Sequence, residues 1–224
     1  MPRTQLVITV LSRILGSIPI FMLFFFLPAG TWEYWQAWVY ISILITPMFF
    51  AMFYLLKNNP ELLERRMRLK EQRAEQRQIL QFSYIFFLLA FILPGFDKRF
   101  GWSDLPTGVV LAADACVLLG YLIVFRVMQI NSFASRVIEV AEDQKVIDTG
   151  LYSVVRHPMY VGAILLYVAS PLALGSLWAV LPALGIIPII VARTKDEELA
   201  LEKDLPGYVE YKKKTKYRLI PFIW

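Results

Sequence analysis

The segment 150–162 reads Gly150-Leu-Tyr-Ser-Val-Val-Arg-His-Pro-Met-Tyr-Val-Gly162, and it holds the single histidine of the chain, His157, at the edge of an apolar run. Proline suits the first position of a helix, because its missing N–H would be unpaired there anyway. We therefore predict that a helix begins at Pro158, with Arg156 and His157 at an end whose free N–H groups can bind an anion. The alternative is a plain transition from a loop into the membrane, with Arg156 facing lipid head groups.

The composition indicates an integral membrane protein. Of the 224 residues, 58% are hydrophobic, 15% are aromatic and 18% are charged, which is far from a soluble domain. We expect one helical bundle. The net charge of +5 could indicate a nucleic-acid partner, but the basic residues border apolar segments. The lipid bilayer, with its anionic head groups, is the simpler partner, and nucleic acid is not expected.

Metal and disulfide chemistry are not expected either. The single cysteine, Cys116, excludes an intramolecular disulfide and a cysteine-based metal site. With one histidine, a zinc site would need mostly carboxylates. The first apolar run continues to about Pro28, which is too long for the apolar part of a signal peptide, so it indicates a retained membrane helix.

Apolar segments predict an all-α fold with five to six transmembrane helices, because about 20 residues cross the hydrocarbon core. The segments are 6–27, 36–56, 79–93, 107–128, 158–174 and 177–191. Pro94-Gly95 is predicted to end the third segment. The last two are short, joined by a tight turn at Gly175-Ser176, and form a helical hairpin. The cluster of Trp32, Tyr34, Trp35 and Trp38 fits an interfacial aromatic belt.

The segment 57–78 is the most charged part of the chain, and we predict a helix on the membrane surface there. Asn59 can cap this helix and Pro60 can start it. Two pairs have the i,i+4 spacing of helical ion pairs: Glu61/Arg65 and Glu64/Arg68. A solvated charged connector is the alternative.

Asp114 interrupts the fourth apolar segment. An ionisable residue within a membrane span is a functional candidate. The alternatives are a hydrogen bond to a neighbouring helix or a position near the interface.

The distribution of Lys and Arg predicts the orientation. Six crossings place the N-terminus, the segments 57–78 and 129–157, and the C-terminus on one side. That side carries nearly all the basic residues, whereas the other has Lys98 and Arg99. We therefore expect a multi-pass protein whose N-terminus, C-terminus and His157 segment are cytoplasmic.

The chain turns polar after Val191. If the sixth helix continues unbroken, Arg193 and Glu197 lie at i,i+4 on one face. Thr194 and Glu197 also have capping-box spacing, so a new helix start is the alternative. In either case the antiparallel hairpin brings these residues near Arg156 and His157. The result is a pocket open to lipid on one side.

The motif Arg156-His-Pro-Met-Tyr-Val-Gly162 and the residues that follow it resemble the isoprenylcysteine carboxyl methyltransferase family, to which phospholipid N-methyltransferases are related. The later residues of the pattern are Arg193, Glu197-Glu198, Gly207-Tyr208, Tyr211, Arg218 and Pro221. The resemblance covers about residues 131–224. It implies a methyltransferase-like catalytic region at 129–224, made of a loop, the hairpin and the tail, behind four spans and a charged connector (57–78) at 1–128.

The resemblance also implies S-adenosylmethionine as the methyl donor, bound by cytosolic elements of this region. The residues implied at the cofactor are Gln144, Lys145, Val146, Ile147, Tyr152, Arg156, His157, Pro158, Met159, Tyr160, Glu197 and Tyr208. Glu197 matches the acidic residue beside the cofactor, and Arg193 matches the arginine facing the substrate. The chain departs from the family where Leu205-Pro206-Gly207 runs straight into Tyr208.

The chemistry of methyl transfer is compatible with these residues. A carboxylate acceptor needs alignment and desolvation rather than a base, and Arg193 can orient it bidentately. An amine acceptor would need a base, which Glu197 could supply. We expect a methyltransferase acting on a lipid-like or isoprenyl-bearing acceptor that enters from the bilayer, with carboxylate O-methylation favoured. The alternatives are an NADPH-dependent sterol-type reductase and a non-enzymatic transporter or scaffold.

Overall fold

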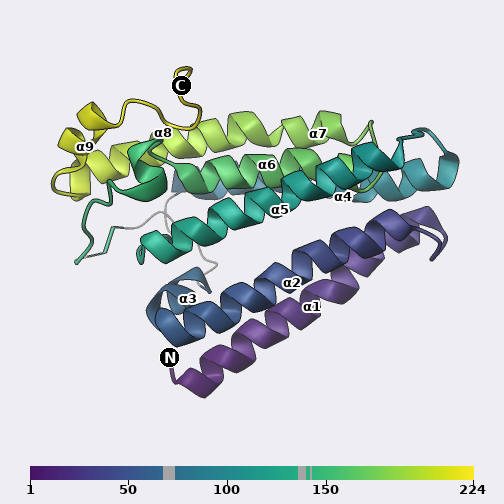
Figure 1. The fold of residues 1–224 in the computed structure, drawn as a ribbon, viewed down its shortest axis with the longest axis horizontal. Coiled ribbons are helices and arrows are strands. Elements are labelled where there is room, and N and C mark those ends of the chain that lie inside the picture. Colours follow the sequence, from purple (N-terminus) through teal and green to yellow (C-terminus); the bar gives the residue numbers. More distant parts are fainter. Residues whose placement is uncertain (68–73, 136–139, 142) are drawn as a thin grey trace.

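The computed structural model describes residues 1–67, 74–135, 140–141 and 143–224, which form helices joined by short connections. In chain order the elements are α1 (Arg3–Ala29), α2 (Trp35–Asn58), α3 (Pro60–Arg66), α4 (Ala74–Phe100), α5 (Thr107–Ile130), η1 (Gly150–Ser153), α6 (Pro158–Ala173), α7 (Val180–Leu184), α8 (Ile186–Asp204) and α9 (Tyr208–Lys214). The long helices run alongside one another, and α3, α9 and the N-terminus lie at one end of the bundle (Figure 1). We call this end the polar end.

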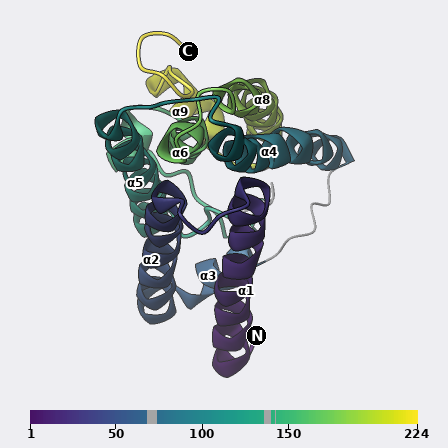
Figure 2. The ribbon, with the colours of Figure 1, turned by 90° about the vertical axis from the view of Figure 1, so that its right-hand side faces the viewer.

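The helices form two groups. Figure 2 shows α1 and α2 as a pair beside a layer that contains α4, α5, α6 and α8. An aromatic core joins the pair to the layer, because the rings of Phe25, Tyr40 and Phe91 lie with centroids 5.8–6.2 Å apart. These rings come from α1, α2 and α4, so burial of large aromatic surface holds the two groups together.

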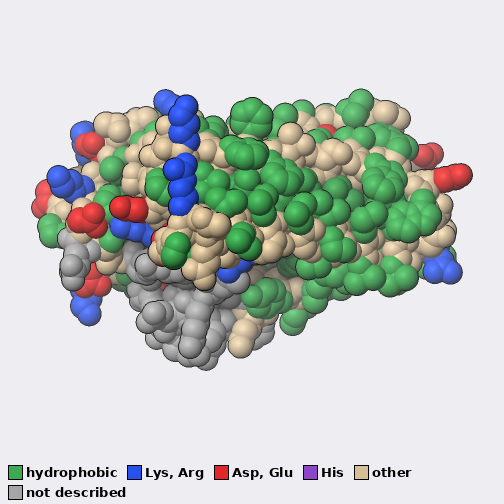
Figure 3. Space-filling model, turned by 90° about the horizontal axis from the view of Figure 1, so that it is seen from below, with side chains coloured by type: hydrophobic (Ala, Val, Ile, Leu, Met, Phe, Trp, Pro, Cys, Tyr) green, Lys and Arg blue, Asp and Glu red, His purple; other side chains and the backbone are tan. Residues whose placement is uncertain are grey.

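The predicted all-α membrane fold is confirmed. Among the described residues, α1, α2 and α5 are long and apolar enough to cross a membrane, and α6 is a shorter apolar helix. Figure 3 shows hydrophobic side chains over most of one face, with charged side chains gathered toward its ends. This distribution fits a bundle whose middle lies in lipid and whose ends lie in water.

Two glycines let α5 and α6 pack in backbone contact. A Cβ atom on Gly120 would lie 2.7 Å from the carbonyl oxygen of Gly162, and one on Gly162 would lie 2.8 Å from that of Gly120. Small residues at such crossings allow close approach of membrane helices. The contact fixes the position of α6, which begins at Pro158 as predicted.

The predicted end of the third span at Pro94-Gly95 is wrong, because α4 continues through both residues to Phe100. Gly95 does not end the helix but allows α4 to pack closely against α1, since a Cβ there would lie 2.7 Å from the carbonyl oxygen of Phe25 in α1. The extra turns bury Asp97, whose carboxylate accepts hydrogen bonds from the Ser103 backbone N–H at 2.7 Å and from the Ser176 hydroxyl. Asp97 therefore ties the end of α4 to the α6–α7 turn, rather than lying in a polar loop.

The sixth predicted segment, 177–191, is not one helix. α7 ends at Leu184, and α8 begins at Ile186 and extends to Asp204, well beyond the apolar run. The predicted turn before it is confirmed, since Gly175 adopts a left-handed φ of 78°. The second helix of the hairpin, α8, therefore extends into the polar end of the bundle.

The charged connector is helical from Pro60 to Arg66, and the Asn59 side chain caps it by accepting from the Leu62 N–H at 3.0 Å. The predicted Glu61/Arg65 pair is wrong. Arg65 instead lies 3.9 Å from the Asp143 carboxylate and 5.1 Å from the centroid of the Phe133 ring. Arg68, of the second predicted pair, lies outside the described residues.

Two residues of the spans are more buried than predicted. Tyr34 is not part of the exposed belt, because it is 1% exposed and donates to the Leu174 carbonyl oxygen. Trp32, Trp35 and Trp38 are exposed as predicted. Asp114 is buried, and its carboxylate oxygens have no hydrogen-bond partner within the described ranges. The alternative of a hydrogen bond to a neighbouring helix is therefore wrong for the described residues.

Candidate functional site

The start of α6 is held in place by the C-terminal tail. The Arg156 N–H donates to the Tyr217 carbonyl oxygen at 2.9 Å, and the His157 N–H donates to that of Arg218 at 3.0 Å. His157 is the N-cap residue and Pro158 occupies the first turn, as the sequence predicts. The tail therefore fixes where the first turn of α6 faces.

A buried carboxylate, Glu198, stands behind this turn. It is 2% exposed and accepts from Arg156 Nε at 2.6 Å and from Arg218 Nε at 2.8 Å. His157 Nε2 lies 3.3 Å from the same carboxylate. Burial acts to raise the pKa of Glu198, but the hydrogen bonds from His157, Arg156 and Arg218 outweigh it and lower the pKa to about 2. Glu198 is therefore ionised, and its one negative charge is shared by the two arginines Arg156 and Arg218.

The guanidinium of Arg156 binds the backbone of the C-terminal tail. It also donates through Nη1 to the carbonyl oxygens of Thr215 at 2.8 Å and Lys216 at 2.7 Å. These bonds join the start of α6 to the tail. The alternative in which Arg156 faces lipid head groups is wrong, because the residue is 5% exposed.

On the cavity side of α8, three side chains form a chain of hydrogen bonds. α8 runs unbroken through Thr194, whose hydroxyl donates to the Ile190 carbonyl oxygen, so Arg193 and Glu197 share one face. Arg193 Nε donates to the Tyr160 hydroxyl at 3.0 Å, and that hydroxyl donates to the Glu197 carboxylate. The antiparallel hairpin thus brings the first turn of α6 to the middle of α8, as predicted.

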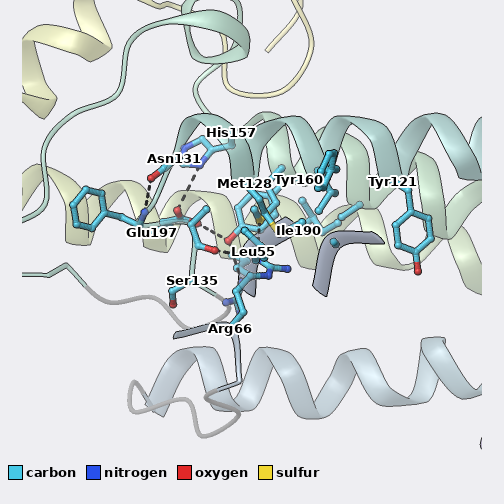
Figure 4. A pocket seen from close by; sticks show the side chains of 18 of the residues that line it. Leu55, Arg66, Tyr121, Met128, Asn131, Ser135, His157, Tyr160, Ile190 and Glu197 are labelled. Atoms are coloured by element: carbon cyan, nitrogen blue, oxygen red, sulfur yellow. Dashed lines mark hydrogen bonds and ion pairs between the residues drawn. The ribbon is translucent and has the colours of Figure 1, made fainter. Parts of the chain in front are cut away.

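These residues line a cavity of about 1150 Å³. Ligand pockets usually measure roughly 300–1,000 Å³, so this cavity has room for more than one small ligand. Figure 4 shows His157, Tyr160 and Glu197 toward one end of the cavity and Tyr121 at the other. Lining residues of α5 run from Leu118 to Met128, which spans about 15 Å of helix.

Most of the predicted site residues line this cavity. They are Gln144, Lys145, Val146, Ile147, Tyr152, Arg156, His157, Met159, Tyr160, Arg193, Glu197 and Tyr208. Pro158, which is buried at the start of α6, is not among the described lining residues. The segment 144–147, the α6 start, α8 and α9 therefore meet around one space.

Two tyrosines on the wall remain neutral at physiological pH. Burial raises the pKa of the Tyr152 phenol to about 12, although its hydrogen bond from the Asn131 amide opposes the shift. Burial, together with the negative charges of Glu198 and Glu197, raises the pKa of Tyr208 well above its ordinary value. The Tyr208 hydroxyl is buried and has no hydrogen-bond partner in the described part of the chain. It is a donor available to a ligand.

Sequence reasoning missed several residues at this site. Asn131 ends α5 and holds the Tyr152 hydroxyl at 2.8 Å, and Arg66 of α3 lines the cavity. The position of Asn131 directly after an apolar run is a signal that could have indicated its role. Glu198 belongs to the quoted motif, but sequence reasoning assigned it no role apart from that of Glu197.

The segment that forms much of this site was compared with known families. Residues 109–205 match the model of the phospholipid methyltransferase family. A comparison with curated proteins finds no match. The matched segment runs from the first turn of α5 to Leu205, and it includes His157, Arg193 and Glu197. It confirms the resemblance to a membrane methyltransferase family that the sequence indicates: the segment 109–205 is similar to the phospholipid methyltransferase family.

Proposed function

We propose that the protein transfers a methyl group from S-adenosylmethionine to a lipid-like acceptor. The observation that carries this proposal is that one continuous cavity joins a polar region, at Glu197 and Tyr160, to an apolar region that reaches Tyr121. A polar donor and an acceptor with an apolar tail need these two environments side by side. The family match over 109–205 supports a methyltransferase in general.

The polar end has the groups that S-adenosylmethionine requires. Glu197 lines the cavity and its side chain is 27% exposed, so its carboxylate suits the sulfonium or the ribose hydroxyls. The Tyr208 hydroxyl, buried without a partner among the described side chains, can donate to the donor's carboxylate or adenine. The ring of Tyr160 lies stacked on His157, with centroids 5.8 Å apart, and offers an aromatic face to a cation. The bound donor supplies an electrophilic methyl group.

The role of the protein in this reaction is alignment. Arg193 can hold an anionic acceptor, because guanidinium binds carboxylates bidentately. Its Nε is fixed by the Tyr160 hydroxyl, so the guanidinium has a defined direction. A carboxylate acceptor is already deprotonated at pH 7, and we therefore favour O-methylation of a carboxylate, as in an isoprenylcysteine. If the acceptor is an amine, the Glu197–Tyr160 pair can take its proton.

The acceptor enters from the bilayer in this proposal. Three residues of the cavity wall are strongly exposed on the apolar surface: Phe50 at 73%, Tyr84 at 60% and Leu122 at 56%. Openings lined by such residues let an apolar tail pass between lipid and cavity. We further propose that the polar end is cytoplasmic, in accord with its basic residues.

Titration calorimetry of detergent-solubilised protein with S-adenosylmethionine and with NADPH tests the proposal. We expect S-adenosylmethionine to bind and Glu197→Ala to abolish that binding. His157→Ala should act in the same way, whereas Arg193→Ala should impair use of the acceptor and leave donor affinity intact. Binding of NADPH alone would indicate a reductase, and binding of neither would indicate a non-enzymatic protein.

A further inference from the structure

Residues 218–224 form a closed loop, which we call the tail loop. The backbone N–H groups of Arg218, Leu219 and Ile220 all donate to the Trp224 carbonyl oxygen, at 2.9–3.1 Å. Leu219 is buried, and the guanidinium of Arg218 lies 5.0 Å from the centroid of the Trp224 ring. The tail loop is therefore a folded element that is attached to the rest of the protein.

The tip of the tail loop presents apolar side chains to the outside. Ile220, Phe222 and Ile223 are 52%, 88% and 77% exposed. Phe222 also adopts a left-handed φ of 66°, which is unfavourable for a residue with a bulky side chain. Its ring lies 5.3 Å from that of Tyr217, but burial within the described part of the protein does not offset the cost, since the side chain is so exposed. An apolar surface outside the protein would cover this tip.

The tail loop lies at the level where α6 begins. The carbonyl oxygens of Tyr217 and Arg218 accept from the two backbone N–H groups that precede Pro158. From Pro158 onward α6 is apolar, so its start marks the boundary of the lipid-facing part of the bundle. Figures 1 and 2 both show the C-terminus extending from the side of the bundle that lies opposite α1 and α2. A segment that projects sideways at this level meets the head groups of the surrounding lipid.

Two lysines just before the tail loop can bind anions. The side chains of Lys213 and Lys216 are exposed, and neither has an ion pair or a hydrogen bond within the described ranges. Their neighbours differ, because Lys212 pairs with Glu202 and Lys214 pairs with Asp148. Apolar side chains beside basic ones are typical of segments that bind the surface of anionic membranes.

We propose that the tail loop docks on the lipid surface at the polar end of the bundle. Its apolar tip enters the head-group region, and Lys213 and Lys216 bind anionic lipids. Three side chains cannot supply the roughly 800 Å² per partner of a stable protein–protein interface. Insertion of a few apolar side chains, combined with attraction to negative head groups, is sufficient for a lipid surface.

Docking also acts on the donor site, in a step that rests on the proposed function. The residues at the base of the tail loop hold the start of α6, and Arg218 Nε donates to the Glu198 carboxylate at 2.8 Å. His157, which these contacts position, lines the cavity. A lipid surface that binds the docked loop better than a displaced one shifts the protein toward the state in which the contacts are formed. Anionic lipid should therefore raise the affinity for S-adenosylmethionine.

A fluorescent label on the tail loop measures docking in lipid nanodiscs. In the Cys116→Ser background, Ile223→Cys takes an environment-sensitive label at the tip. Asp204→Cys is the matched control, since Asp204 is exposed at the end of α8. With a spin-labelled lipid as quencher, we expect strong quenching at position 223 and little at position 204. Absence of quenching at 223, or equal quenching at both positions, would overturn the proposal, and a blue shift without quenching would indicate a protein partner instead.

The lipid charge tests the role of the lysines. A basic residue near an anionic surface contributes about a fivefold factor in affinity, so Lys213→Gln with Lys216→Gln should lower the ratio of docked to free loop roughly twentyfold. This loss should appear in nanodiscs that contain phosphatidylglycerol and not in those of phosphatidylcholine alone. Lys98→Gln with Arg99→Gln removes the same charge from the last turn of α4 and should leave the quenching unchanged. The same loss in both double variants would refute a specific role of the tail lysines.

Titration with S-adenosylmethionine in the same nanodiscs tests the effect on the donor site. We expect several-fold tighter binding with phosphatidylglycerol than without it, and we expect Phe222→Ser with Ile223→Ser to remove this difference. If the label docks but the donor binds equally in both kinds of nanodisc, the coupling is wrong. If the label docks and S-adenosylmethionine does not bind at all, the proposed function fails and the docking of the tail loop stands.

Discussion

Replacing Glu198 with glutamine removes one buried negative charge and keeps the shape of the side chain. The carboxylate accepts from Arg156 and Arg218 and lies beside His157. The amide retains one acceptor oxygen but turns an NH₂ group toward a guanidinium. Arg156, which is 5% exposed, would then be a buried cation without a charge partner, and breaking such a pair is strongly destabilising.

The magnitude follows from the pKa of Glu198. Its hydrogen bonds overcome the effect of burial and lower the pKa from 4.5 to about 2. This shift corresponds to at most about 3 kcal/mol of unfolding free energy at neutral pH. Because the folded-state pKa is lowered, the stabilisation is complete above pH 4.5 and is lost as the pH falls toward 2. The difference between wild type and Glu198→Gln should thus be constant from pH 6 to 8.

Thermal unfolding in detergent, followed by tryptophan fluorescence, measures this difference. A loss of about 3 kcal/mol corresponds to a decrease in Tm of about 6–12 °C for a protein of this size. S-Adenosylmethionine affinity should fall as well, because the tail that positions His157 loosens. Glu202→Gln is the control on the same helix: Glu202 pairs with Lys212 and both side chains are about one-third exposed, so its effect should be small. Equal Tm shifts in the two variants would refute the reasoning.

Three further substitutions test other parts of the molecule. Gly162→Ala should destabilise the protein by about 1–3 kcal/mol, because the new Cβ would lie 2.8 Å from the Gly120 carbonyl oxygen; thermal unfolding measures it. Tyr160→Phe removes the hydroxyl that donates to Glu197, and we expect about tenfold slower methyl transfer in a radiolabel assay with Tm nearly unchanged. Asp97→Ala removes the acceptor of the buried Ser176 hydroxyl and of the half-buried Ser103 hydroxyl, and it should cost about 1–3 kcal/mol of stability without altering S-adenosylmethionine affinity.

The sequence predicted those features that depend on local rules. The starts of α3 and α6 were found because Asn59-Pro60 and His157-Pro158 combine a cap position with a proline. The same reasoning failed at Pro94, where contact of Gly95 with α1 keeps the helix going. Packing against a neighbouring helix can compensate for a proline inside a membrane helix, and a pattern within one segment cannot reveal such packing.

Prediction from the sequence also fails to distinguish neighbouring residues of like charge. Glu197 faces the cavity, whereas Glu198 is buried behind His157. Arg66 lines the cavity, whereas its neighbour Arg65 is bound to Phe133 and Asp143. Consecutive helical residues point about 100° apart, so the rotation of the packed helix decides which one reaches a ligand. That rotation follows from tertiary packing.

The α6 wall and the α3 wall of the cavity are held by different kinds of contact. This difference predicts which contacts open when an acceptor enters. The α6 wall is joined to α5 by backbone contact at Gly120 and Gly162, and to the tail by buried charge at Glu198. The α3 wall is joined to the segment that follows α5 by the contacts of Arg65 and Arg66. Local opening requires least free energy where few buried contacts break. We therefore expect the contacts of Arg65 and Arg66 to open first when an acceptor enters, while Leu62 and Leu63 hold α3 in the buried cluster and the proposed donor site on α6 and α8 stays formed.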